Sequence, residues 1–466
     1  MERKNAWKSY EEKEVKELET LCEEYRRFLD QGKTERECVK YIVTMAKQYG
    51  YEDLEEVRKS GRTLKTGDKV YAVNMKKAIA LFQIGKRPLT EGMNILGAHI
   101  DSPRMDVKQN PLYEDTDFAY LDTHYYGGIK KYQWVTLPLA IHGVVAKKDG
   151  EVIDVVIGED EKDPIFCVTD LLIHLAGEQM EKKAAKVVEG EQLDLLVGSR
   201  PLVEKENEDN TTEKEAVKKM ILSILKEKYD MEEEDFLSAE WEIVPAGKAR
   251  EAGLDASMIM AYGQDDRVCA YTSAAAIFGM DEVDKTACCL LVDKEEIGSV
   301  GATGMQSKFF ENTVAEIMEL AGEYSELNLK RSLAASNMLS SDVSAAYDPN
   351  YASAFEKKNA AYFGRGVVFN KFTGARGKSG SNDANAEYIG KLRKIMDDNN
   401  VAFQTAELGK VDIGGGGTIA YILSLYGMNV IDSGVAVLNM HAPWEITSKA
   451  DVYEAAKAYK AFLRDA

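Results

Sequence analysis

The sequence lacks the features of several large classes of protein. Its 466 residues include only five histidines and six cysteines. The longest apolar run, TACCLLV before Asp293, is too short to cross a bilayer, and the first residues, MERKNAWKSYEEKE, contain no apolar core of a secretory signal. The cysteines show no CxxC spacing, which predicts buried reduced thiols without a disulfide or a thiolate zinc site. We therefore expect a cytoplasmic protein that does not span a membrane.

Basic residues are outnumbered as well. The chain carries 59 Lys and Arg against 79 Asp and Glu, a formal net charge of −20. An acidic surface repels phosphate backbones and anionic lipid headgroups, which argues against nucleic acids and membrane surfaces as partners. With 45% hydrophobic and 30% charged residues, the chain is long enough for two to four domains with substantial cores. These numbers favour a folded enzyme or an acidic scaffold.

Several common catalytic motifs are missing. The sequence has no HExxH zinc helix and no GxSxG nucleophile elbow. The segment GARGKSGS at 374–381 has Phe372 where a phosphate-binding loop needs its first glycine. The glycine run at 414–417 does not match the pattern GxGxxG either, because Ile419 occupies its last position. We therefore expect no nucleotide cofactor.

Hydrophobic periodicity predicts an α/β fold with an interruption. Amphipathic helices are expected between 9 and 50, strands at 69–84 and 93–99, and a helix followed by a buried strand at 268–293. Between these parts the chain changes to short β-like runs, with a hairpin turn at Asp149–Gly150 and a charged helix near 213–228. The prediction is one discontinuous α/β catalytic domain, 1–103 and 254–466, and a β-rich domain at 104–253.

Metal-type ligands recur where the predicted strands give way to loops, which is where open α/β sheets build their sites. The segments are AHIDSP (His99, Asp101), GQDDR (Asp265, Asp266), DKEEIGS (Glu295, Glu296), SSDVS (Asp342) and NMHAP (His441). Singly, each residue is consistent with a structural role. Together they suit two zinc ions, because zinc accepts imidazole nitrogen and carboxylate oxygen and two ions can share one carboxylate.

Two spacings suggest particular roles. In His99-Ile100-Asp101 the aspartate can hold the second ring nitrogen of a metal-binding histidine. At an extended strand end, the neighbouring side chains of Glu295 and Glu296 would point in opposite directions, so that one binds metal and the other serves as general base.

As an ordered set, the segments GAHIDSP, GQDDR, DKEEIGSVGA, SSDVSAAYDPNY and NMHAPWEI resemble the di-zinc aminopeptidase family of aspartyl aminopeptidase and the vacuolar aminopeptidase I. The resemblance extends through essentially the whole chain. It implies the following roles: His99 and Asp342 bind one zinc, Glu296 and His441 bind the other, Asp265 bridges them, Glu295 is the general base and Asp101 supports His99.

The resemblance also implies an architecture. The family fold is a catalytic domain of the phosphorylase/hydrolase type, a mixed sheet flanked by helices, with an inserted β-rich dimerisation domain. Its members assemble as tetrahedral dodecamers with the active sites facing an inner chamber. After Asp342 the chain reads VSAAY, without the histidines usual in aspartyl aminopeptidases. The preferred N-terminal residue, acidic or neutral, is therefore left open.

The sequence thus predicts a cytoplasmic, homo-oligomeric metalloaminopeptidase that acts on peptides with a free N-terminus through a water activated by two metal ions. Zinc is the expected metal, and cobalt and manganese also suit such ligands. Two alternatives are a related di-metal carboxypeptidase or deacylase, and a non-catalytic assembly protein of the same fold. The second alternative predicts a broken ligand set, whereas all the expected ligands and the base are present in the sequence.

Overall fold

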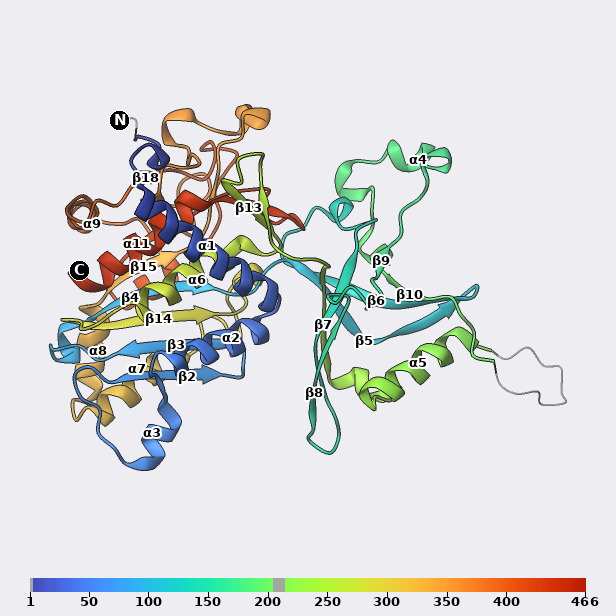
Figure 1. The fold of residues 1–466 in the computed structure, drawn as a ribbon, viewed down its shortest axis with the longest axis horizontal. Helices are drawn as coiled ribbons and strands as arrows, with labels where there is room; N and C mark the ends of the chain where they lie inside the picture. Colours follow the sequence, from blue (N-terminus) through green and yellow to red (C-terminus); the bar gives the residue numbers. More distant parts are fainter. Residues whose placement is uncertain (1–2, 204–213) are drawn as a thin grey trace. The chain divides into compact units, whose positions relative to one another are not determined.

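The computed structural model describes residues 3–203 and 214–466. The chain divides into two compact units, the first formed by Met1–Ser102, Ala249–Met440 and Trp444–Ala466 and the second by Pro103–Lys248 and His441–Pro443. The described residues form a mixed α/β fold with three sheets (Figure 1). None of the described helices combines the length and the apolar character that crossing a bilayer requires.

A nine-stranded mixed sheet is the centre of the first unit. Its order is β1 (Glu52–Asp53), β2 (Lys69–Asn74), β3 (Ala78–Gln83), β14 (Thr286–Val292), β4 (Met93–His99), β15 (Asn337–Ser341), β19 (Asn429–Gly434), β17 (Val367–Asn370) and β18 (Phe403–Thr405). The four strands β14, β4, β15 and β19 run parallel to one another.

Strand β14 shows why this sheet is covered on both faces. Along a strand, successive side chains point to opposite faces. Cys288 and Leu290 lie in one buried apolar cluster, and Cys289 and Leu291 lie in the other. The two adjacent cysteines are therefore separated by the sheet. All six cysteines are free thiols, and only Cys167 among them is partly exposed.

Helices form the outer layers of this unit. One apolar cluster joins the sheet to α1 (Glu12–Gln31), α2 (Glu35–Gln48), α6 (Gln264–Phe278), α9 (Ala386–Asp398) and α11 (Lys449–Asp465). The other joins it to α3 (Leu54–Ser60), α7 (Phe309–Leu320), α8 (Glu326–Ala334) and α10 (Ala420–Ser424). The amphipathic pair expected between 9 and 50 forms α1 and α2, and Thr34 begins α2 with a capping box to Glu37.

A small five-stranded sheet completes the first unit. Its order is β12 (Arg250–Ala252), β13 (Met258–Ala261), β21 (Glu445–Ser448), β20 (Ala436–Leu438) and β16 (Ser344–Ala345). It matters for the site because β13 leads into α6 and β21 pairs with β13 in antiparallel register.

The second unit is built on a seven-stranded antiparallel sheet. Its order is β8 (Val152–Ile157), β7 (Leu139–Ala146), β11 (Ala239–Pro245), β5 (Arg104–Asp115), β6 (Phe118–Tyr126), β10 (Leu195–Gly198) and β9 (Cys167–Val168). The expected hairpin is formed by β7 and β8. The charged helix is α5 (Ala216–Tyr229), and α4 (Gly177–Met180) is a short helix of the same unit.

We expect the core of the nine-stranded sheet to dominate the stability of the first unit. Leu290 is completely buried, so Leu290→Ala should lower the free energy of unfolding by about 3 kcal/mol through lost burial and the cavity left behind. Leu425 is 80% exposed, and Leu425→Ala should change it by less than about 0.5 kcal/mol. Chemical denaturation followed by circular dichroism measures both, and equal effects would contradict the assigned layers.

Candidate metal centre

Three adjacent parallel strands end together at one edge of the large sheet. Strand β4 lies between β14 and β15, with Val292 opposite His99 and Ser340 opposite Gly97. His99 is the last residue of β4, and Asp342 directly follows β15. The register therefore brings these two side chains, 243 residues apart in sequence by their numbers, to the same edge.

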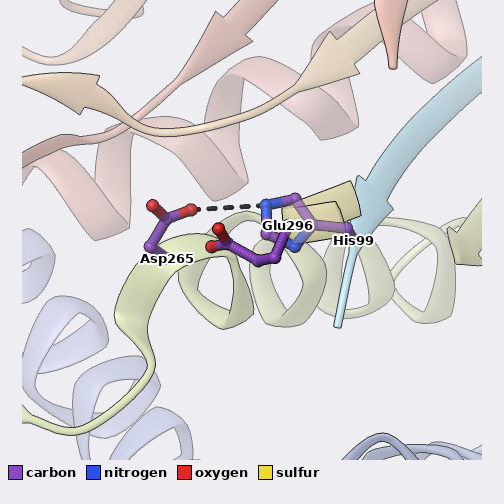
Figure 2. A group of neighbouring side chains, drawn as sticks. All are labelled: His99, Asp265 and Glu296. Atoms are coloured by element: carbon purple, nitrogen blue, oxygen red, sulfur yellow. Dashed lines mark ion pairs between the residues drawn. The ribbon is translucent and has the colours of Figure 1, made fainter. Parts of the chain in front are cut away.

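The imidazole of His99 is the centre of the cluster. It is buried, and its Nε2 atom lies 3.3 Å from Oδ1 of Asp265. The same nitrogen lies 4.0 Å from Oδ1 of Asp342 and 4.0 Å from Oε2 of Glu295. Figure 2 shows the Asp265 and Glu296 carboxylates beside the ring. Four sequence-distant segments thus supply side chains to one buried site.

Asp101 contacts the opposite side of the ring and also the glutamate pair. Nδ1 of His99 lies 3.0 Å from the backbone oxygen of Asp101 and 3.3 Å from its Oδ1. The Asp101 carboxylate also accepts hydrogen bonds from the backbone N–H groups of Glu295 and Glu296, each at 3.1 Å. One buried carboxylate therefore helps to position the histidine and both glutamates.

The sequence predicted that the two glutamates lie on an extended strand end, and the structure shows that they do not. Strand β14 stops at Val292, Lys294 has a positive φ of 70°, and Glu295–Ile297 form a short 3-10 helix. Successive side chains of a 3-10 helix diverge by about 120°, because it has 3.0 residues per turn. Strand alternation therefore does not apply to the pair, and both side chains lie near His99.

Two neighbouring aspartates lie in the first turn of α6. Asp265 and Asp266 are both buried, and the peptide bond between them is cis. The segment GQDDR included Asp266 as a candidate ligand, but the family resemblance gave it no role. It nevertheless lies in a potential metal-binding group with His99 and Asp342. Its place beside Asp265 in the segment GQDDR was the available signal.

The described residues contain two groups able to hold a cation, and both include His99. They are His99, Asp265 and Glu296, and His99, Asp266 and Asp342, with the ligand atoms of each group within 4.8 Å of one another. One imidazole nitrogen with two carboxylate oxygens is a donor set that suits zinc. The residues present therefore fit divalent metal ions.

The electrostatics of the cluster favour a cation. Burial lowers the pKa of His99, but its hydrogen bonds with Asp101 and Asp265 and the surrounding negative charge outweigh this effect and hold the pKa well above its usual value. Burial raises the pKa of Asp266 and of Asp342 well above the usual range, and neighbouring carboxylates add to the shift. A bound divalent ion would favour the ionised carboxylates and the neutral imidazole.

His441 is not part of either group. It is half-buried, has a φ of 65°, and its Nδ1 atom lies 2.8 Å from the backbone oxygen of Gly128. It follows β20 by three residues, and residues 441–443 group with the second compact unit. Its role as a ligand stays a prediction.

Ser102 and Glu445 are two site residues that sequence reasoning missed. Both bond to the backbone of Asp265. Ser102 directly follows Asp101, and Glu445 lies four positions after His441 within NMHAPWEI. Nothing in the type of either residue indicates a bond to another residue's backbone.

Comparisons with known proteins point to one family of metalloproteases. The family model described as "Aminopeptidase I zinc metalloprotease (M18)" matches residues 28–463. A "Probable M18 family aminopeptidase 1" of Clostridium acetobutylicum is 62% identical over 464 residues, which cover 100% of this chain and 98% of that protein. The crystal structure of an M18 family aminopeptidase from Thermotoga maritima is 44% identical with a TM-score of 0.94, covering 100% of both chains. That of aminopeptidase I from Clostridium acetobutylicum is 60% identical with a TM-score of 0.92, covering 100% of this chain and 99% of the other.

We expect Asp265→Asn to weaken Zn²⁺ binding by more than the roughly 10–100-fold that loss of an outer hydrogen-bond partner costs, because an amide oxygen carries no charge. Competition with a chromophoric chelator measures the affinity. Asp451 is a matched control, since its buried carboxylate accepts backbone N–H groups of Gly364 and Gly366 and belongs to neither group. Asp451→Asn should leave the affinity unchanged, and an equal loss in both variants would contradict the assignment.

Proposed function

The chain belongs to the M18 family of zinc metalloproteases and is an aminopeptidase, and we propose that the cluster around His99 is its catalytic centre. The observation that carries this proposal is the meeting of His99, Asp265 and Glu296 at the carboxyl edge of the parallel strands. We propose further that the substrates are peptides with a free N-terminus.

We propose that two divalent ions, both zinc, occupy this centre. His99 and Asp342 would hold one ion, Glu296 and His441 the other, and Asp265 would bridge them. Asp265 and Glu296 belong to one group of potential ligands, which supports an ion at Glu296. Asp342 lies 4.0 Å from Nε2 of His99, which supports a second ion beside it. Cobalt and manganese accept the same donor atoms and are alternative metals.

The ions would supply Lewis acidity, which lowers the pKa of a water molecule and polarises the scissile carbonyl. Glu295 then acts as general base: its carboxylate takes a proton from the water and delivers it to the nitrogen of the leaving amine. Its side chain is 17% exposed, so a substrate can reach it, while Asp101 holds its backbone N–H. Recognition of the free α-amine would restrict cleavage to the first peptide bond.

We propose that the first unit is a catalytic domain of the phosphorylase/hydrolase type and that the second is an inserted dimerisation domain, with boundaries near 104 and 253. A tetrahedral dodecamer of dimers is the proposed assembly. Exposed apolar side chains that are close in sequence in the second unit support self-association, since contiguous exposed apolar surface marks interaction sites. They are Leu172, Ile173, Leu175 and Met180, exposed at 54%, 68%, 68% and 66%. Six free thiols fit a reducing compartment, and we propose the cytoplasm.

A panel of peptides tests the activity. We expect cleavage of peptides with a free N-terminus, no cleavage of the same peptides after N-acetylation, and loss of turnover on chelation that Zn²⁺ restores. Cleavage of the blocked peptides would favour the deacylase or carboxypeptidase alternative. Absence of turnover with metal bound would favour the assembly protein.

The variant Glu295→Gln completes this experiment. Because the amide cannot accept the proton, kcat should fall by about 10²–10⁴-fold while both metals stay bound. Glu326 lies on the exposed side of α8 and pairs with Lys330, so Glu326→Gln is a control that should keep full turnover. Undiminished turnover of Glu295→Gln would remove Glu295 from its role.

For the assembly, we expect Ile173→Asp with Leu175→Asp to dissociate the oligomer, because two buried charges at an interface are costly to desolvate. Sedimentation velocity reports the size of the particle. Leu237 is 62% exposed in the same unit, and Leu237→Asp should sediment as the unmodified protein does. An unchanged sedimentation coefficient of the double variant would contradict the proposed interface.

A further inference from the structure

The backbone of Asp265 is bonded to side chains on both sides. Its N–H donates to Oε2 of Glu445 at 2.9 Å, and its carbonyl oxygen accepts from Oγ of Ser102 at 2.6 Å. Asp265 has φ −81° and ψ 106°, which are not helical values, although it lies in the first turn of α6. The first backbone N–H groups of a helix have no acceptor within the helix, so the Asp265 N–H must bond elsewhere.

Both partners of Asp265 are buried, Glu445 in a strand and Ser102 in the loop after β4. Ser102 is completely buried and follows Asp101, which contacts His99. Glu445 is 1% exposed and is the first residue of β21, where it pairs in register with Ala261 of β13. Strand β21 therefore fixes one of the two groups that hold the Asp265 backbone, and the loop after β4 carries the other.

The preceding residue, Gln264, ties the same turn to more of the fold. Its Nε2 atom donates to the backbone oxygens of Ile259 and Glu445, at 3.1 Å and 2.7 Å. Its Oε1 atom accepts from the hydroxyls of Thr447 and Tyr25, at 2.6 Å and 3.1 Å. The start of α6 is thus locked to β13, β21 and α1 immediately before the aspartate.

The acceptor at Glu445 is a carboxylate, although a neutral group could also accept the Asp265 N–H. A buried carboxylate is expensive, and this one bonds to the residue whose own carboxylate adds negative charge to a crowded cluster. What it supplies is an acceptor at a defined position. Metal sites tolerate errors of only about 0.5 Å in their ligands, and residues behind the ligands provide that accuracy.

We propose that Ser102 and Glu445 are positioning residues that fix the Asp265 peptide, so that the Asp265 carboxylate faces His99 and Glu296 before metal binds. This inference rests on the proposed metal centre and deepens it. Neither residue needs to touch metal or substrate. Their effect passes through the orientation of one ligand.

Paired substitutions at Glu445 test the role. Glu445→Ala removes the acceptor, whereas the amide oxygen of Glu445→Gln can still accept the Asp265 N–H. We expect the alanine variant to bind Zn²⁺ roughly 10–100-fold more weakly and the glutamine variant to bind within about threefold of the unmodified protein. Chelator competition gives the affinities, and the visible spectrum of bound Co²⁺ should change in the alanine variant only.

Matched controls separate positioning from general stability. Glu454 is also 1% exposed and its carboxylate also accepts a backbone N–H, from Ala402, so Glu454→Ala should lower the melting temperature without changing Zn²⁺ affinity. Ser336 is a buried serine whose hydroxyl donates to a backbone oxygen, that of Ser332, and Ser336→Ala is the control for Ser102→Ala. We expect Ser102→Ala to weaken Zn²⁺ binding about tenfold.

Zn²⁺ affinity of Glu445→Ala equal to that of the unmodified protein would overturn the inference, as would an equal loss in the alanine and glutamine variants. If Glu445→Ala does not fold, Ser102→Ala decides: an unchanged affinity overturns the inference and a weakened one supports it. Failure of the unmodified protein to bind Zn²⁺ would instead reject the metal centre itself.

Discussion

The buried crowding of carboxylates around one imidazole is the constraint on which the site depends. Asp265, Asp266 and Asp342 are buried beside His99, and burial together with neighbouring like charges raises the pKa of Asp266 and of Asp342. Apolar packing alone does not favour bringing these charged groups together. A divalent cation offsets the repulsion between the carboxylates. The folded site therefore holds an excess of negative charge around His99 that metal binding neutralises.

The large sheet is stabilised by apolar packing away from the site, and this stability makes the crowding of charged side chains possible. In β14 the side chains of Cys288 and Leu290 pack on one side and those of Cys289 and Leu291 on the other, so the strand is buried on both faces. The polar cluster begins only where these strands stop, at His99 and Asp342. The apolar layers and the charged site occupy successive stretches of the same strands.

Local pattern predicted much of the fold, and long-range geometry did not follow from it. Apolar residues at helical spacing predicted α1 and α2, and the runs ending at His99 and Val292 predicted β4 and β14. The order of the nine strands was not predictable, because it joins segments such as 93–99 and 337–341 that share no local signal. In the site, the ligand types at strand ends pointed to His99, Asp265, Glu296 and Asp342. The turn of Glu295–Ile297 and the bonds of Ser102 and Glu445 to a distant backbone depend on three-dimensional approach, which residue types do not encode.

Asp101 has a consequence for how such a site can change over evolution. Its carboxylate accepts the N–H groups of Glu295 and Glu296, and it also contacts Nδ1 of His99. A substitution there would alter a proposed base and two proposed ligands at the same time. None of the three could be adjusted separately through this residue. Natural variation of substrate range in this chain should therefore arise in loops that do not contact the Asp101 carboxylate. The residues of the proposed hydrolytic site would then be retained together.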